Sequence, residues 1–211
     1  MILNDFSLTP PVRGLSFHAV FVVLDGLWSE VWRAGSVLYF LESMRCISSQ
    51  GIAIAMDRQP HYIETVQSIV RSAKELHLAM TNQGEVSVNY ACIFAQNKEE
   101  FDTFEAALQS SGKVIQKTKS GPVFAVPPFP TAAGPLKIVK IRRPDPSRPE
   151  RGDADFTLLN YSEFKDAHLG HPGWKLIERP DMEMLELAHP RYDVLVYYSH
   201  PTLAEVLGVK P

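Results

Sequence analysis

The chain has 211 residues, of which 45% are hydrophobic and 21% charged, and its formal net charge is -3. This length and composition are typical of a folded globular protein with one large domain or two small ones, and they exclude disordered and collagen-like chains. The acidic balance lacks the positive field that nucleic-acid-binding proteins present to phosphates, so no nucleic-acid partner is predicted.

The part of the chain before residue 85 shows alternating strand and helix patterns. Apolar runs predict strands at residues 15–24 and 51–56, and apolar residues at helical spacing predict helices at residues 27–48 and 60–80. The N-terminus lacks the basic region of a secretory signal, and the apolar run within the first strand is too short to span a bilayer. These features predict a cytoplasmic protein with no membrane partner.

The two cysteines, Cys46 and Cys92, each lie within an apolar run and outside any Cys-x-x-Cys pair. This placement argues against a zinc–thiolate site and against a disulfide framework. Both are predicted to be buried, reduced thiols.

From residue 86 onward the predicted order changes to one helix among several strands. An N-capping Asn97 three residues before a glutamate predicts the start of a helix, and Gly112 predicts its end. Around this helix, strands are predicted at residues 86–94, 113–119, 122–126 and 136–142.

The same order recurs after the proline- and charge-rich loop at residues 143–152. A strand is predicted at residues 154–158, a helix from Asn160 to Gly170, and strands at residues 174–177, 182–187 and 192–198. Both helices open with Asn-x-x-Glu-Phe, and Asn97 and Asn160 lie 63 residues apart. Either the modules are duplicated, or two helices share a common capping motif by chance.

Two β-α-β-β-β modules in tandem resemble the vicinal oxygen chelate superfamily, which has the glyoxalase-like fold, over about residues 86–198. The resemblance implies an α+β fold class in which the modules form a curved mixed sheet around a small-molecule site. An additional N-terminal β-α-β-α region lies outside the resemblance. The predicted domains are therefore residues 1–85 and 86–211, either separate or packed as one.

Members of this superfamily that perform chemistry usually hold a divalent metal through His and Glu on the first and last strands of the modules. The first strands of this chain carry Asn89 and Tyr90 in one module and Asp155 in the other, so the usual histidines are missing. Only Glu186 matches a late-strand ligand position.

Arginines are concentrated between residues 137 and 155. Guanidinium groups suit bidentate capture of carboxylate or phosphate, which makes Arg142 and Arg151, with Asp155 nearby, candidate ligand-binding residues. The alternative is that acidic residues of the same segment neutralise these arginines on a solvated surface.

Histidines and carboxylates gather in residues 168–200. Imidazole and carboxylate groups together suit a divalent metal site or an acid–base pair, and Glu186 with His189 is the candidate pair for both roles. Strand alternation places Glu183 and Glu186 on opposite faces of one strand, each among apolar neighbours, so Glu183 is a further candidate for ligand binding. The alternative is that these residues are ordinary surface groups.

Two functions remain open from the sequence. One is a glyoxalase-like small-molecule-binding protein, with or without a divalent metal, that acts as a lyase, isomerase or dioxygenase. The other is a non-catalytic binding or dimerisation module without metal, in which the repeated modules form a homodimer. Whether the chain is an enzyme is not predicted.

Overall fold

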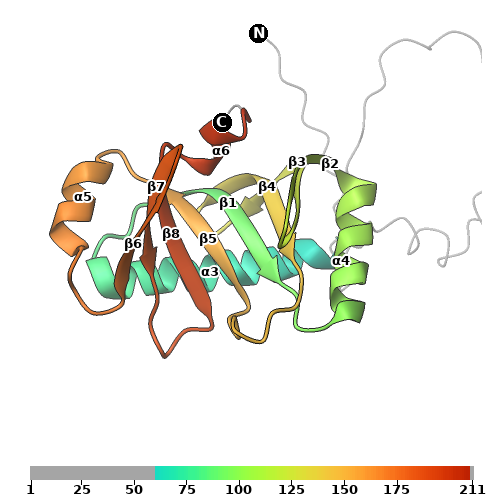
Figure 1. Ribbon diagram of the computed structural model, residues 1–211, viewed down its shortest axis with the longest axis horizontal. Helices are drawn as coiled ribbons and strands as arrows, with labels where there is room; N and C mark the ends of the chain where they lie inside the picture. The colour runs from blue at the N-terminus through green and yellow to red at the C-terminus, as the bar shows by residue number, and fades with distance from the viewer. Residues whose placement is uncertain (1–59, 210–211) are drawn as a thin grey trace, which may run out of the picture. The chain divides into compact units, whose positions relative to one another are not determined.

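The computed structural model describes residues 60–209 of the chain (Figure 1). Cys46 and the strands and helix predicted before residue 57 lie outside this part. Helix α3 (His61–Thr81) comes first and agrees with the helix predicted at residues 60–80. The first module is β1 (Ser87–Phe94), α4 (Lys98–Ser111), β2 (Lys113–Thr118), β3 (Gly121–Thr131) and β4 (Gly134–Arg142). The second is β5 (Gly152–Thr157), α5 (Tyr161–His168), β6 (Trp174–Arg179), β7 (Met182–Leu187) and β8 (Val194–His200), followed by α6 (Leu203–Val206).

The strands form one curved, unclosed sheet in the order β2-β3-β4-β1-β5-β8-β7-β6. In each module the first strand pairs in parallel with the last, β1 with β4 and β5 with β8, and the other pairs are antiparallel. The modules meet where β1 pairs antiparallel with β5. The α+β class and the paired β-α-β-β-β modules are therefore confirmed.

The structure extends β3 beyond its predicted end at residue 126, through a proline-rich segment that the sequence assigned to a connection. Prolines lack the N–H group that a central strand needs. The last pair between β2 and β3 joins Lys113 to Ala125, so no described strand pairs with the rest of β3 on that side. Prolines are tolerated there because this edge makes no ladder with any strand of residues 60–209.

The two Asn-x-x-Glu-Phe helices occupy equivalent places but begin differently. Asn97 accepts a hydrogen bond from the backbone N–H of Glu100 at 2.8 Å, whereas Asn160 makes no capping bond with its side chain. Phe101 and Phe164 are each the fourth residue of their helix, and both are buried in the same core. The shared element order and buried positions support the repeat, although only the first motif caps its helix.

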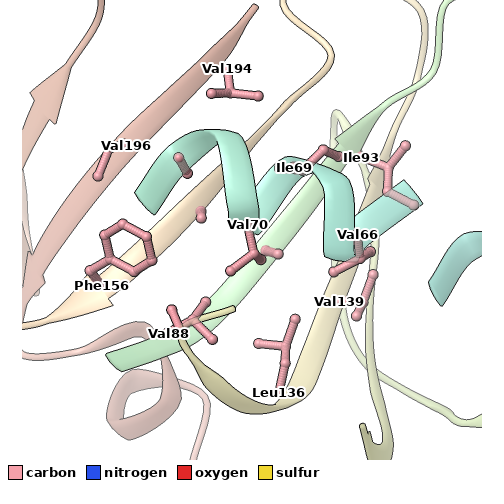
Figure 2. Close-up of a cluster of buried hydrophobic side chains, with 14 of the residues drawn as sticks. Val66, Ile69, Val70, Val88, Ile93, Leu136, Val139, Phe156, Val194 and Val196 are labelled. Atoms are coloured by element: carbon pink, nitrogen blue, oxygen red, sulfur yellow. The ribbon is translucent and has the colours of Figure 1, made fainter. Parts of the chain in front are cut away.

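Helix α3 runs across the strands and packs against β1, β5 and β8 (Figure 1). Its apolar residues recur every three or four positions, from Val66 through Ile69 and Val70 to Ala73, as expected for one buried stripe. Figure 2 shows the valines and the isoleucine of this stripe against Val88, Leu136, Phe156 and other residues of the central strands. Although the sequence places α3 in the region before residue 86, it shares a core with the modules; the domain boundary itself stays a prediction.

The sheet has two different faces. The helix-covered face, toward α3, α4 and α5, holds the large apolar core. The other face, here called the cavity face, carries a smaller apolar cluster and is partly covered by residues of the C-terminal segment around α6. Among residues 60–209, no helix is both long enough and apolar enough to cross a membrane.

Candidate functional site

A cavity of about 390 Å³ lies between the cavity face and α6. Its floor comes from β1, β4, β5 and β8, which are the four central strands, and Leu203 and Leu207 of the C-terminal segment form part of its wall. A hydrogen-bonded capping box between Thr202 and Glu205 fixes the start of α6. The volume falls in the range of ordinary small-molecule sites.

Strand register aligns three chemically distinct side chains across this floor. Cys92 of β1 is the direct partner of Lys140 on β4 and of Asp153 on β5. Residues directly opposite each other on neighbouring strands point to the same face, and neighbouring strands lie about 4.8 Å apart. Lys140 and Asp153 therefore face the cavity from either side of Cys92.

Asp153 is a buried carboxyl group that lacks a protein partner. Its side chain is 7% exposed, and its Oδ1 atom is buried with no hydrogen bond to any residue of the described part. Burial raises the pKa of Asp153 to about 7 against the opposing pull of Lys140 and Arg142. Because an unpaired buried carboxyl destabilises the fold, its presence on a cavity wall points to a ligand group as the missing partner.

Asp155 lies two residues further along β5 and, unlike Asp153, has hydrogen-bond partners for its buried carboxyl group. Its Oδ1 atom accepts a 2.9 Å hydrogen bond from Asn89 Nδ2, and its Oδ2 atom accepts one from the hydroxyl of Ser199. Burial raises its pKa to about 6, while these hydrogen bonds lower it. Asp155 is thus satisfied within the protein and does not line the cavity.

Cys92 and Tyr90 form the neutral part of the floor. Burial raises the pKa of the Cys92 thiol well above its usual value, and nearby Asp153 raises it further. Burial raises the pKa of Tyr90 in the same way. A thiol held protonated is a poor nucleophile, so Cys92 acts as an apolar surface between Lys140 and Asp153.

Basic side chains dominate the charges around the cavity. Five line it, Lys119, Lys140, Arg142, Arg148 and Arg179, against one acidic residue, Asp153. Lys140 is half-buried and forms no salt bridge with a described residue. The net charge of the whole chain is -3, so this positive cavity is a local departure from an acidic protein.

Arg142 and Arg148 are positioned by acidic neighbours. Arg142 forms a 2.7 Å salt bridge with Asp145, and its guanidinium lies 5.1 Å from the centre of the Phe94 ring. Arg148 Nη1 lies 3.8 Å from Glu186 Oε2. Both arginines therefore keep a defined place beside the cavity, with part of their charge balanced.

Glu186 lies behind the cavity wall. Its Oε2 atom accepts a 2.6 Å hydrogen bond from the hydroxyl of Tyr197, and Tyr197 itself lines the cavity. Glu183 faces the other side of the sheet and pairs with Lys165 of α5 at 2.7 Å. The opposite orientations of the two glutamates follow the strand alternation seen in the sequence.

The other predicted site residues lie elsewhere. His189 lines a separate cavity of about 450 Å³ beside the loop between β7 and β8, where its Nδ1 atom accepts a hydrogen bond from the backbone N–H of Arg191 at 3.3 Å. Arg151 forms a 2.7 Å salt bridge with Glu100 and donates a hydrogen bond to the carbonyl of Phe94. Of the predicted ligand-binding residues, the structure brings only Arg142 to the cavity.

The cavity face does not fit a divalent metal ion. Within residues 60–209, no group of three or more His, Cys, Asp and Glu side chains is arranged to hold a metal. Metal sites need several deprotonated donors, whereas the floor offers a protonated thiol and one carboxyl, Asp153, whose pKa is raised by burial. Glu186 and His189, the predicted ligands, line no common cavity.

A larger hollow, of about 650 Å³, lies beside the start of α5. Glu85 and Glu163 line it together with exposed Leu159, and it contains no lysine or arginine. None of the buried polar atoms that lack partners belongs to its lining residues. It therefore lacks the combination of charge and unmet hydrogen bonding that marks the cavity at Asp153.

Asp153, Lys140 and Tyr197 are not among the site residues predicted from the sequence. Asp153 is one of the acidic residues that, in the alternative interpretation, neutralise the arginines of residues 137–155. One available signal was the sequence Gly-Asp-Ala-Asp-Phe in β5, in which two carboxylates alternate with apolar residues and so share one face of a buried strand.

Comparisons with known proteins give fold likeness at most. No protein-family model and no curated protein matches the chain. A solved structure titled "Structural Genomics, Protein EC4020" matches with 15% sequence identity and a TM-score of 0.47, over 75% of this chain and 91% of that one. A glyoxalase I mutant from Zea mays matches with 14% identity and a TM-score of 0.32, over 57% of this chain and 47% of that one. Both identities and both TM-scores are too low to assign a function.

Proposed function

We propose that this chain binds a small organic anion in the cavity between the cavity face and α6. The observation that carries the proposal is the charge of the lining, five basic side chains against one acidic, in a protein whose net charge is negative. A concave site with low-dielectric walls concentrates such a field and attracts anions. Lys140 is the principal anion-binding residue because it lies on the central strand β4 in the floor of the cavity and no salt bridge within the described part occupies it.

This function is the small-molecule binding expected of a glyoxalase-like fold, without the divalent metal that the resemblance implies. Arg142 and Arg148 assist Lys140, and apolar residues such as Val123 and Met184 contact the body of the ligand. A binding protein and an enzyme that uses no metal both agree with these residues. A pure dimerisation module predicts no ligand in this cavity.

The test is a calorimetric titration of the purified full-length chain with benzoate, pentanoate and phenyl phosphate. Benzamide, an uncharged analogue of benzoate, is the ligand control. We expect at least one anion to bind, and Lys140→Gln to weaken it about tenfold, as expected for loss of a hydrogen bond to a charged group. Lys117→Gln is the matched control, because Lys117 is exposed on β2 and does not line the cavity.

Two results would overturn this proposal. One is that benzamide binds as tightly as benzoate, which would show that charge does not select the ligand. The other is that Lys140→Gln and Lys117→Gln have equal effects, which would place the anion elsewhere on the protein.

A further inference from the structure

The unpaired carboxyl of Asp153 limits which anions suit the cavity. Its Oδ1 atom is buried, lies on a side chain that lines the cavity, and has no hydrogen bond to any described residue. Other buried polar atoms in residues 60–209 also lack partners, but those of His77, Asn89, Glu150 and Tyr161 belong to residues that do not line this cavity. Asp153 is thus the one described lining residue with an unmet hydrogen bond.

When Asp153 is ionised, a carboxylate alone cannot meet this need, because a carboxylate has only acceptor oxygens and would be repelled by the charge of Asp153. A hydroxyl, amine or amide N–H group would instead donate to Oδ1. Asp155 shows this chemistry inside the protein, since its two oxygens accept hydrogen bonds from Asn89 and Ser199.

The register sets where the two ligand groups would lie. Lys140 and Asp153 are both partners of Cys92, so their backbones are separated by two strand spacings, roughly 10 Å. The neutral thiol of Cys92 lies between them. A ligand that binds both residues therefore needs a charged group for Lys140 and a separate donor group for Asp153.

We propose that this cavity selects organic anions that carry an O–H or N–H donor at the end remote from their charged group. This inference rests on the proposed function. Asp153 accepts the donor, and Lys140 binds the anionic group. Asp153 is therefore a specificity-determining residue, and the ligand body lies over Cys92 and Tyr90.

Matched pairs of ligands test this inference directly. In the rigid pair, 4-hydroxybenzoate carries a donor opposite its carboxylate, and 4-methylbenzoate has a methyl group in the same place. In the flexible pair, 4-hydroxybutyrate is compared with pentanoate. In at least one pair, we expect the ligand with the donor to bind the full-length chain at least about tenfold more tightly than the ligand without it. The ligand without the donor leaves the buried carboxyl of Asp153 unpaired.

Variants of Asp153 then assign the preference to this residue. Asp153→Leu should abolish the preference for the donor while raising the melting temperature, because it removes a buried group that lacks a partner. Asp153→Asn keeps an acceptor oxygen and should retain part of the preference. Lys117→Gln should leave the preference unchanged.

The outcomes separate this inference from the proposed function. If anions bind but donor-bearing and donor-lacking members have equal affinity, the inference is overturned and the proposed function stands. Persistence of the preference in Asp153→Leu also overturns it. Failure of every anion to bind the wild-type chain overturns both.

Discussion

The two faces of the sheet are built from the same strands but bury different groups: one face holds the large apolar core, and the other holds a carboxyl group on the wall of a cavity. On the helix-covered face, Phe156 and Tyr198 are fully buried among aromatic neighbours, including His77 and Phe164. On the cavity face, Asp153 shares a cavity with five basic residues, and its Oδ1 atom has no hydrogen-bond partner among the described residues. The difference teaches that the apolar core of one face supplies stability, whereas the unpaired carboxyl of the other face costs stability.

The largest expected effect is a cavity opened on the helix-covered face. Phe156→Ala should lower the free energy of unfolding by about 3–5 kcal/mol, because the helices and neighbouring rings cannot collapse onto the space. On the cavity face, Met184→Ala enlarges an existing hollow and should cost about 2 kcal/mol or less, at the low end for such changes. Urea denaturation measures both, with circular dichroism to verify folding. Equal losses of unfolding free energy in the two variants would contradict the proposed difference between the two faces of the sheet.

The second effect is a pH dependence that belongs to Asp153. Its pKa is about 7 in the folded protein and near its ordinary value of 3.8 when unfolded, so the folded state binds the proton more tightly. The stabilisation is fully present below pH 3.8 and is lost as the pH rises through 7. Relative to Asp153→Asn, the wild-type free energy of unfolding should therefore fall across this window, by on the order of 4 kcal/mol.

Asp145 provides a control of opposite sign for this measurement. Its hydrogen bonds with Ser147 and Arg142 lower its pKa from 3.8 to about 2. Its stabilisation is present above pH 3.8 and is lost as the pH falls through 2, so the wild type should gain relative to Asp145→Asn as the pH rises across that range. If the difference in unfolding free energy between the wild type and Asp153→Asn does not change from about pH 4 to 7, Asp153 ionises with its ordinary pKa and the prediction is wrong.

The smallest effects distinguish the two glutamates of β7. Glu186→Gln keeps an acceptor for the Tyr197 hydroxyl but removes the negative charge 3.8 Å from Arg148. The affinity for 4-hydroxybenzoate should rise by about 1 kcal/mol, roughly fivefold, because the cavity becomes more positive. Weaker binding would instead favour the role for Glu186 that the sequence suggested.

Glu183→Gln is the matched change on the helix-covered face. It removes the charge that pairs with Lys165 at 2.7 Å. The pair is partly exposed, so the expected cost is about 0.5 kcal/mol in unfolding free energy. Calorimetry with 4-hydroxybenzoate should show no change in affinity.

Local patterns predicted most of the fold. The Asn97 cap, the buried Phe101 and Phe164, and the alternation of apolar residues along the strands identify both modules because each depends on neighbours in sequence. The same local rule places Glu183 and Glu186 on opposite faces. The end of β3 was missed because tolerance of proline depends on which strand edge is free, and that is a property of the whole sheet.

The site could not be predicted in this way. Cys92, Lys140 and Asp153 come together through the register of three strands, which no local pattern specifies. An irregularity between Val88 and Tyr90 also interrupts the alternation of β1, so that Val88 faces the helices and Tyr90 the cavity. Simple alternation would have placed both on one face.

The antiparallel pair of β1 with β5 is the only strand pairing between the modules within the described residues. The nine residues from 143 to 151 connect the modules and let β5 reach β1 of its own chain. A connection too short to reach would leave two chains exchanging modules, with β1 of each pairing with β5 of the other. Each cavity would then combine Lys140 and Cys92 from one chain with Asp153 from its neighbour, so the length of this connection decides whether a site belongs to one molecule or is shared by two.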